Sequence, residues 1–151
     1  MNRSTVLTAI AALVLAGPAA ARAAQVTHSD AEWRKLLTPE SYDVLRHAGT
    51  ERPFSSPLDE EKRRGTYACA GCDLALFSSK TKYDSGSGWP SFWAPLPNAV
   101  VTKSDSSLLM TRTEVRCRRC DGHLGHVFDD GPKPTGLRYC MNGVALRFKP
   151  A

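Results

Sequence analysis

Apolar residues follow a helical period only near the start of the folded chain. A capping box at residues 29–32 precedes an apolar pattern that begins at Trp33, which predicts a short helix. Thr38 as an N-cap and Pro39 in the first turn predict a second short helix that ends at Gly49. Two short helices are therefore expected before any sheet.

The rest of the chain alternates short runs of strand-forming residues with turn residues. The predicted strands are Gly65–Cys69, Leu74–Ser78, Ser91–Trp93, Val100–Lys103, Leu108–Cys117, His126–Phe128, Leu137–Met141 and Val144–Phe148. These segments are too short, and the helices too few, for a parallel sheet with helical crossovers. The pattern predicts an α+β chain, mostly β, with an antiparallel sandwich or barrel.

The first two dozen residues differ from the rest. One positive charge at Arg3 precedes an apolar run over residues 6–15, and the tripeptide 21–23 has small residues at the −3 and −1 positions. This order is typical of a secretory signal peptide covering residues 1–23, which leaves residues 24–151 as one exported domain, periplasmic or secreted. A mitochondrial transit peptide is the alternative. The run is shorter than the ~20 residues of a membrane span, which argues against stable membrane association.

Length and charge narrow the class of protein further. With 151 residues, the chain has room for one domain with its own core. The net charge of +5 falls to +3 without the leader, because Arg3 and Arg22 lie in it. The charges are mostly interspersed, so nucleic acid is not expected as a partner. The one basic cluster, Arg116 to Arg119, flanks cysteines.

Four of the five cysteines form two Cys-x-x-Cys pairs, Cys69 with Cys72 and Cys117 with Cys120. Each pair can place two thiolates on one side of a tight turn, and two pairs complete a tetrahedral S₄ shell for zinc. Two disulfides are the alternative in an exported chain, although Cys-x-x-Cys loops are strained when oxidised. A DNA-binding zinc finger is weaker, because arginines beside thiolates also serve to offset the site's negative charge. One structural zinc ion is favoured.

Cys140 is the fifth cysteine. A lone cysteine can be a small buried hydrophobe. Arg138, two residues before it, shares its face on a strand, where the positive charge would lower the thiol pKa; Asn142 lies on that face too. Upstream, His123 and His126 are the residue type that activates a thiolate or donates a proton. Together these residues favour a nucleophilic cysteine.

Residues 85–93 combine two glycines with three aromatic side chains, Trp89, Phe92 and Trp93. The glycines permit a sharp loop, and the aromatic rings can build an apolar wall. Such a wall suits a methyl-bearing ligand such as a thioether, because contacts between sulfur and aromatic rings are favourable. A corner of the core around a tryptophan is an equally good interpretation of this segment alone.

Together these segments closely resemble the B-type methionine sulfoxide reductases. The motifs are Cys-x-x-Cys, Ser-Gly-x-Gly-Trp-Pro-Ser-Phe, Cys-x-x-Cys-x-Gly-His-Leu-Gly-His-Val-Phe and Arg-Tyr-Cys-x-Asn, in family order over residues 33–148. The resemblance implies two antiparallel sheets in a distorted barrel or sandwich, short N-terminal helices and a structural zinc remote from the active site. The implied zinc ligands are Cys69, Cys72, Cys117 and Cys120.

The resemblance also implies an activity. Cys140 would attack the sulfur of methionine-R-sulfoxide, mainly in oxidised proteins, releasing methionine and becoming a sulfenic acid. The implied catalytic residues are Cys140, His123, His126 and Asn142, and the implied substrate-binding residues are Trp89, Phe92, Arg138 and Asp130. One of the two histidines would handle the proton that the sulfoxide oxygen needs before it can leave.

One position departs from the family pattern. Many members carry a second redox cysteine in the Gly-x-Gly-Trp loop, where this chain has Ser87. A serine cannot form a disulfide, and the other four cysteines are assigned to zinc. We therefore expect a one-cysteine enzyme whose sulfenic acid is reduced by an external thiol, such as a thioredoxin-like or glutathione-like partner.

Overall fold

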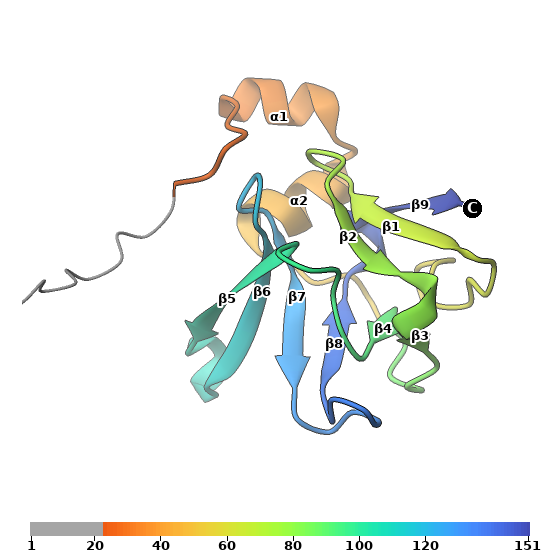
Figure 1. Ribbon diagram of the computed structural model, residues 1–151. Coiled ribbons are helices and arrows are strands. Elements are labelled where there is room, and N and C mark those ends of the chain that lie inside the picture. The colour runs from red at the N-terminus through yellow and green to blue at the C-terminus, as the bar shows by residue number, and fades with distance from the viewer. Residues whose placement is uncertain (1–22) are drawn as a thin grey trace, which may run out of the picture.

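The computed structural model describes residues 23–151, and Figure 1 shows two short helices beside two antiparallel sheets. The predicted signal peptide lies outside the described residues except for its last position, 23. Within the described part of the chain, no helix has the length and apolar character of a membrane span.

Both predicted helices are confirmed. Helix α1 (Asp30–Leu36) begins with the predicted capping box, in which the Ser29 hydroxyl accepts from the backbone N–H of Glu32 and the Glu32 carboxylate accepts from that of Ser29. Helix α2 (Pro39–His47) ends in a left-handed residue, Ala48, at φ 53°. It packs against the second sheet at strand β7.

The strands form two sheets in which every neighbouring pair is antiparallel. The first sheet has the order β2 (Ala75–Ser78), β1 (Gly65–Cys69), β9 (Leu146–Pro150). The second has the order β3 (Lys82–Tyr83), β4 (Ser91–Phe92), β8 (Arg138–Met141), β7 (His123–Phe128), β6 (Arg112–Cys117), β5 (Val100–Asp105). The predicted pair of antiparallel sheets is confirmed, and among the described residues they do not close into a barrel.

Several strand boundaries differ from the prediction: β7 begins three residues earlier and β9 two residues later than expected, and the largest difference is at β6. The apolar run from Leu108 was expected to belong to the strand that ends at Cys117, but β6 begins at Arg112. Residues 107–109 instead form a 3₁₀ turn in which Leu108 has φ 57°, a value incompatible with an extended strand. These apolar side chains reach solvent rather than the core, so hydrophobicity alone placed the boundary wrongly.

The core lies between the two sheets and is rich in aromatic rings. Phe92 of β4 stacks on Phe77 of β2 with ring centroids 4.4 Å apart, and Tyr67 of β1 meets Phe92 edge-on at 5.0 Å. All three side chains have no exposed surface. Burial of this kind fixes β4 against the first sheet, and with it the adjacent strand β8 that carries Cys140.

Candidate active site and metal centre

Cys140 lies on β8, and the two neighbouring strands, β4 and β7, place polar side chains beside it. The register pairs Cys140 with Ser91 of β4 on one side and with His126 of β7 on the other. Residues directly opposite each other in antiparallel strands project from the same face. A cavity of about 330 Å³ opens on this face, and it is lined by Cys140, His126 and Trp89 together with Arg138 and Asn142.

The thiol of Cys140 is held mainly in its neutral form. Burial raises its pKa above the ordinary thiol value and is the largest influence, while the Ser87 hydroxyl and the Arg138 charge act in the opposite direction. The expected effect of Arg138 therefore exists, but burial outweighs it. Formation of the thiolate at neutral pH needs a group that takes the proton.

A chain of hydroxyl groups leads away from the thiol. The Ser87 Oγ lies 3.9 Å from the Cys140 Sγ and 2.7 Å from the Ser85 Oγ, which in turn lies 2.6 Å from the Ser91 Oγ. The Ser91 hydroxyl also donates to the carbonyl of Trp89. Ser87 is thus positioned beside the Cys140 thiol, at the place where the family pattern often has its second cysteine.

The two histidines have different surroundings. His123 is buried, with its Nδ1 2.5 Å from a Glu114 carboxylate oxygen and its Nε2 without a partner in the described structure. Burial, the largest influence, lowers the pKa of His123, while Glu114 opposes that shift. His126 lines the Cys140 cavity, and its Nε2 lies 2.8 Å from the Asp105 carboxylate. Of the two histidines, only His126 pairs with Cys140 in the strand register and lines its cavity.

The segment around Glu51 forms a further wall of the cavity. The Trp89 indole N–H donates to the Glu51 carbonyl at 3.2 Å, and the Asn142 Oδ1 accepts from the Glu51 N–H at 3.0 Å. The Asn142 amide also donates to the carbonyl of Leu124 at 3.0 Å. Both predicted site residues are therefore fixed by backbone groups, and neighbouring Thr50 lines the cavity.

Two predicted substrate-binding residues lie elsewhere. Phe92 has no exposed surface and stacks on Phe77 in the core, because successive residues on a strand face opposite sides and its neighbour Ser91 takes the cavity side. Asp130 does not line the cavity. It forms a bidentate ion pair with Arg138, with N···O distances of 2.8 and 3.0 Å, and so holds the guanidinium from a position outside the cavity.

Sequence reasoning missed several residues of this site. Thr50, Arg112 and Phe128 line the cavity, and Asp105 and Glu114 pair with the two histidines. Phe128 ends the His-Val-Phe motif and could have been included on that ground. Asp105 and Arg112 lie directly opposite each other in the β5–β6 register, a pairing that only the hairpin geometry reveals.

The four remaining cysteines form one buried cluster. Their sulfur atoms all lie within 4.8 Å of one another, with Cys69–Cys120 at 3.7 Å and Cys72–Cys117 at 3.5 Å, and none forms a disulfide. Tetrahedral zinc with Zn–S bonds of about 2.3 Å places its sulfur ligands roughly 3.8 Å apart. The donor set and its spacing therefore fit Zn²⁺. None of the four lines the Cys140 cavity.

Backbone and arginine contacts support this cluster. The Gly71 N–H donates to the Cys69 sulfur at 3.3 Å, as expected for a thiolate that needs its charge balanced. Arg119 donates to the Cys72 carbonyl and Arg46 to the Cys120 carbonyl. Among the described residues, Arg116 instead pairs with acidic side chains. The cluster joins the β1–β2 turn of one sheet to the β6–β7 turn of the other.

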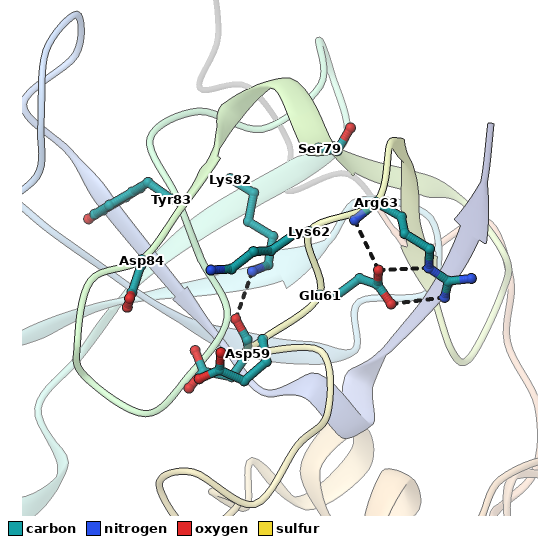
Figure 2. Close-up of a pocket in the computed structure, with 9 residues that line it drawn as sticks. Asp59, Glu61, Lys62, Arg63, Ser79, Lys82, Tyr83 and Asp84 are labelled. Atoms are coloured by element: carbon teal, nitrogen blue, oxygen red, sulfur yellow. Dashed lines mark hydrogen bonds and ion pairs between the residues drawn. The ribbon is translucent and has the colours of Figure 1, made fainter.

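A separate surface hollow carries charges of both signs (Figure 2). Arg63 binds Glu61 with two hydrogen bonds of 2.9 Å and lowers the pKa of that carboxyl to about 2. Lys82 donates to the Asp59 carbonyl at 2.8 Å. The hollow contains neither cysteine nor histidine.

Comparison with known proteins agrees with this geometry. Residues 37–150 match the SelR domain family. A peptide methionine sulfoxide reductase MsrB from Pseudomonas putida is 61% identical over 120 residues, covering 79% of this chain and 90% of the relative. The protein of the same name from Leptospira interrogans is 56% identical over 126 residues, 83% of this chain and 96% of the relative. The matched range includes both cysteine pairs and Cys140.

Proposed function

The chain belongs to the SelR domain family of peptide methionine sulfoxide reductases, and from that premise we propose that it reduces the R epimer through attack by Cys140. The family acts as an oxidoreductase on a sulfur group. The observation that carries the proposal is the position of Cys140, which lines a cavity with His126 and Trp89 beside it.

In the first step the Cys140 sulfur attacks the sulfoxide sulfur. The sulfoxide oxygen accepts a proton, the S–O bond of the substrate breaks, and the oxygen ends on Cys140 as a sulfenic acid while methionine is released. One sulfoxide and one thiol thus give one thioether and one sulfenic acid. The substrate sulfur gains two electrons, which Cys140 loses.

We assign the proton transfer to His126. It lies opposite Cys140 in the register and lines the cavity, whereas His123 does not line it. Asp105 lies against the Nε2 of His126, which leaves Nδ1 to exchange a proton with the thiol and the sulfoxide oxygen. Asp105 would thus orient this ring, as carboxylates orient catalytic imidazoles elsewhere.

The aromatic wall receives the methyl group of the substrate. Trp89 is held in place by its hydrogen bond to the Glu51 carbonyl, and Phe128 lines the same cavity. Contacts between sulfur and aromatic rings favour a thioether product as well as its sulfoxide. The Arg138 charge helps to form the thiolate, and Asp130 positions Arg138.

An external thiol completes the cycle. One thiol of the reductant condenses with the sulfenic acid, which releases water and forms a mixed disulfide with Cys140. A second reductant thiol then attacks this disulfide. Cys140 is released as a thiol, and the reductant is left with a disulfide, either within one molecule or between two. Ser87 lies 3.9 Å from the Cys140 sulfur and offers no sulfur for an internal disulfide. A thioredoxin-like or other small-thiol reductant fits this requirement.

The cysteine cluster would hold one structural Zn²⁺ through Cys69, Cys72, Cys117 and Cys120. Zinc supplies a cross-link there and takes no part in the reaction. We further propose that residues 1–23 direct export to the periplasm or beyond, on the order of charge, apolar run and small residues alone. The substrate would be methionine sulfoxide within oxidised proteins.

Separate assays of the two epimers of N-acetylmethionine sulfoxide test the function. The protein with dithiothreitol should consume the R epimer and leave the S epimer, and Cys140→Ser should abolish turnover without changing the zinc content. After one equivalent of sulfoxide without reductant, mass spectrometry should find one added oxygen on Cys140. A disulfide to one of the cluster cysteines, or consumption of the S epimer alone, would contradict the proposal.

A further inference from the structure

Large apolar side chains are exposed at only a few places in the described structure, and two of these places adjoin segments that line the Cys140 cavity. The exposed residues are Leu36, Phe54, Leu108, Leu109 and Met110. The Phe54 N–H donates to the Gly88 carbonyl at 2.7 Å, and Gly88 lies between the cavity residues Ser87 and Trp89. On the other side, residues 108–110 come just before Arg112, which also lines the cavity.

Three of these side chains have an unfavourable backbone conformation. Phe54, Leu108 and Leu109 have φ values of 61°, 57° and 58°, in the left-handed region that large side chains rarely adopt. Leu109 is fully exposed and Leu108 nearly so. Exposed apolar surface and a disfavoured backbone conformation both work against folding. Such features concentrate at binding sites.

A second hollow lies beside Met110, at the end of the exposed turn. It has a volume of about 520 Å³ and is lined by Met110, Val127 and Leu137, among others. Arg112 and Phe128 line both this hollow and the Cys140 cavity, so the two spaces share a wall. Val127 follows His126 on β7 and packs against the core, so the hollow lies on the other side of the sheet, with Arg112 and Phe128 between the two spaces.

The exposed turn is also tied to the catalytic histidine. The Asp105 carboxylate accepts hydrogen bonds from the Ser107 backbone N–H at 2.9 Å and from Arg112 at 3.2 Å, and it lies 2.8 Å from the His126 Nε2. One side chain thus fixes both the turn that carries Leu108 and Leu109 and the ring that faces Cys140.

We propose that Phe54 and residues 108–110 form an apolar rim that binds the polypeptide on either side of an oxidised methionine and favours substrates with apolar neighbours. This rests on the proposed function, because the cavity must take the sulfoxide itself. A methionine residue that enters the cavity brings its flanking residues to the segments around it. Methionine belongs mostly to protein cores, so its neighbours are often apolar and become accessible when the substrate unfolds.

Peptide kinetics test the rim. Phe54→Asn and Leu109→Asn, singly and combined, remove apolar surface while keeping a residue that tolerates a positive φ. Leu36→Asn, at an exposed leucine on α1, is the matched control. The substrates are two acetylated pentapeptides, with leucine or serine on both sides of methionine-R-sulfoxide, and N-acetylmethionine-R-sulfoxide alone.

The wild type should have a kcat/KM about tenfold higher for the leucine peptide than for the serine peptide, as burial of one or two apolar side chains implies. The double variant should lose this preference and keep its rate on N-acetylmethionine-R-sulfoxide, and Leu36→Asn should behave as wild type. An unchanged preference, an equal loss on all three substrates, or the same loss in Leu36→Asn would overturn the proposal.

A second measurement separates the remaining outcome. If the rim instead joins two copies of this chain, sedimentation velocity should show a dimer for the wild type and a monomer for the double variant. The peptide preference would be the same in both proteins, and the proposal would fail. Absence of any sulfoxide reduction by the wild type would contradict the proposed function itself, which distinguishes the two failures.

Discussion

Removal of the metal should destabilise the protein strongly, because the cysteine cluster connects the two sheets. The cluster closes a loop with 44 residues between Cys72 and Cys117. By the chain-entropy relation for a cross-link, a loop of this length contributes about 4 kcal/mol at 25 °C. For a domain of this size, each kcal/mol changes the melting temperature by roughly 3–4 °C. We therefore expect a strong chelator to lower the melting temperature by roughly 12–16 °C.

Differential scanning calorimetry with and without chelator, both under reducing conditions, measures this effect. Thiol titration provides the chemical check: the native protein should have one reactive thiol, and chelator with denaturant should reveal five, the number in the sequence. Cys140→Ser is the control, with the same melting behaviour and one thiol fewer in each titration. A melting temperature insensitive to the chelator, or a single thiol in denaturant without reductant, would refute zinc and favour the two-disulfide alternative.

Four further predictions concern the active site and core. Ser87→Cys should convert a single turnover from one added oxygen to an internal disulfide with Cys140, a mass loss of two hydrogens; a persistent sulfenic acid would contradict the geometry. Because burial raises the Cys140 pKa and the Arg138 charge opposes this rise, kcat/KM should increase with pH toward an alkaline pKa. Arg138→Met should raise that pKa further and reduce the rate at pH 7 about tenfold for each unit by which the pKa rises. Asp105→Asn should lower kcat for N-acetylmethionine-R-sulfoxide about tenfold or more and shift the pH profile, with KM little changed; loss of melting temperature alone would indicate a structural role. Phe92→Ala should cost about 3–5 kcal/mol in urea unfolding with KM unchanged, whereas a raised KM would return it to the cavity.

The sequence predicted correctly those parts of the fold that depend on interactions between residues close together in the chain. The capping box at residues 29–32 and Thr38 before Pro39 satisfy backbone groups within a few residues, so both helices could be located. The cysteine spacing likewise predicted a cluster whose members meet across two sheets. Strand boundaries depended on burial, and residues 108–110 are apolar without being buried.

The candidate site was predictable only as far as its motifs reached. Trp89, His126 and Cys140 belong to motifs and line one cavity. Phe92 belongs to the same motif as Trp89, but strand alternation turns it into the core, and sequence alone does not say which face of a two-residue strand is inside. Asp105 lies in no motif and meets His126 only because two hairpins are placed side by side.

The order of strands β4, β8 and β7 also bears on stereochemistry. Trp89 precedes β4, Cys140 lies on β8 and His126 lies on β7, so the proposed methyl pocket, nucleophile and proton donor follow the order of three adjacent strands. A sulfoxide sulfur is a chiral centre, and in the proposed mechanism these three contacts read its handedness. Its mirror image would present oxygen to the indole and methyl to the imidazole. Selectivity between epimers then depends on the order of these strands and on the loop that carries Trp89 into β4.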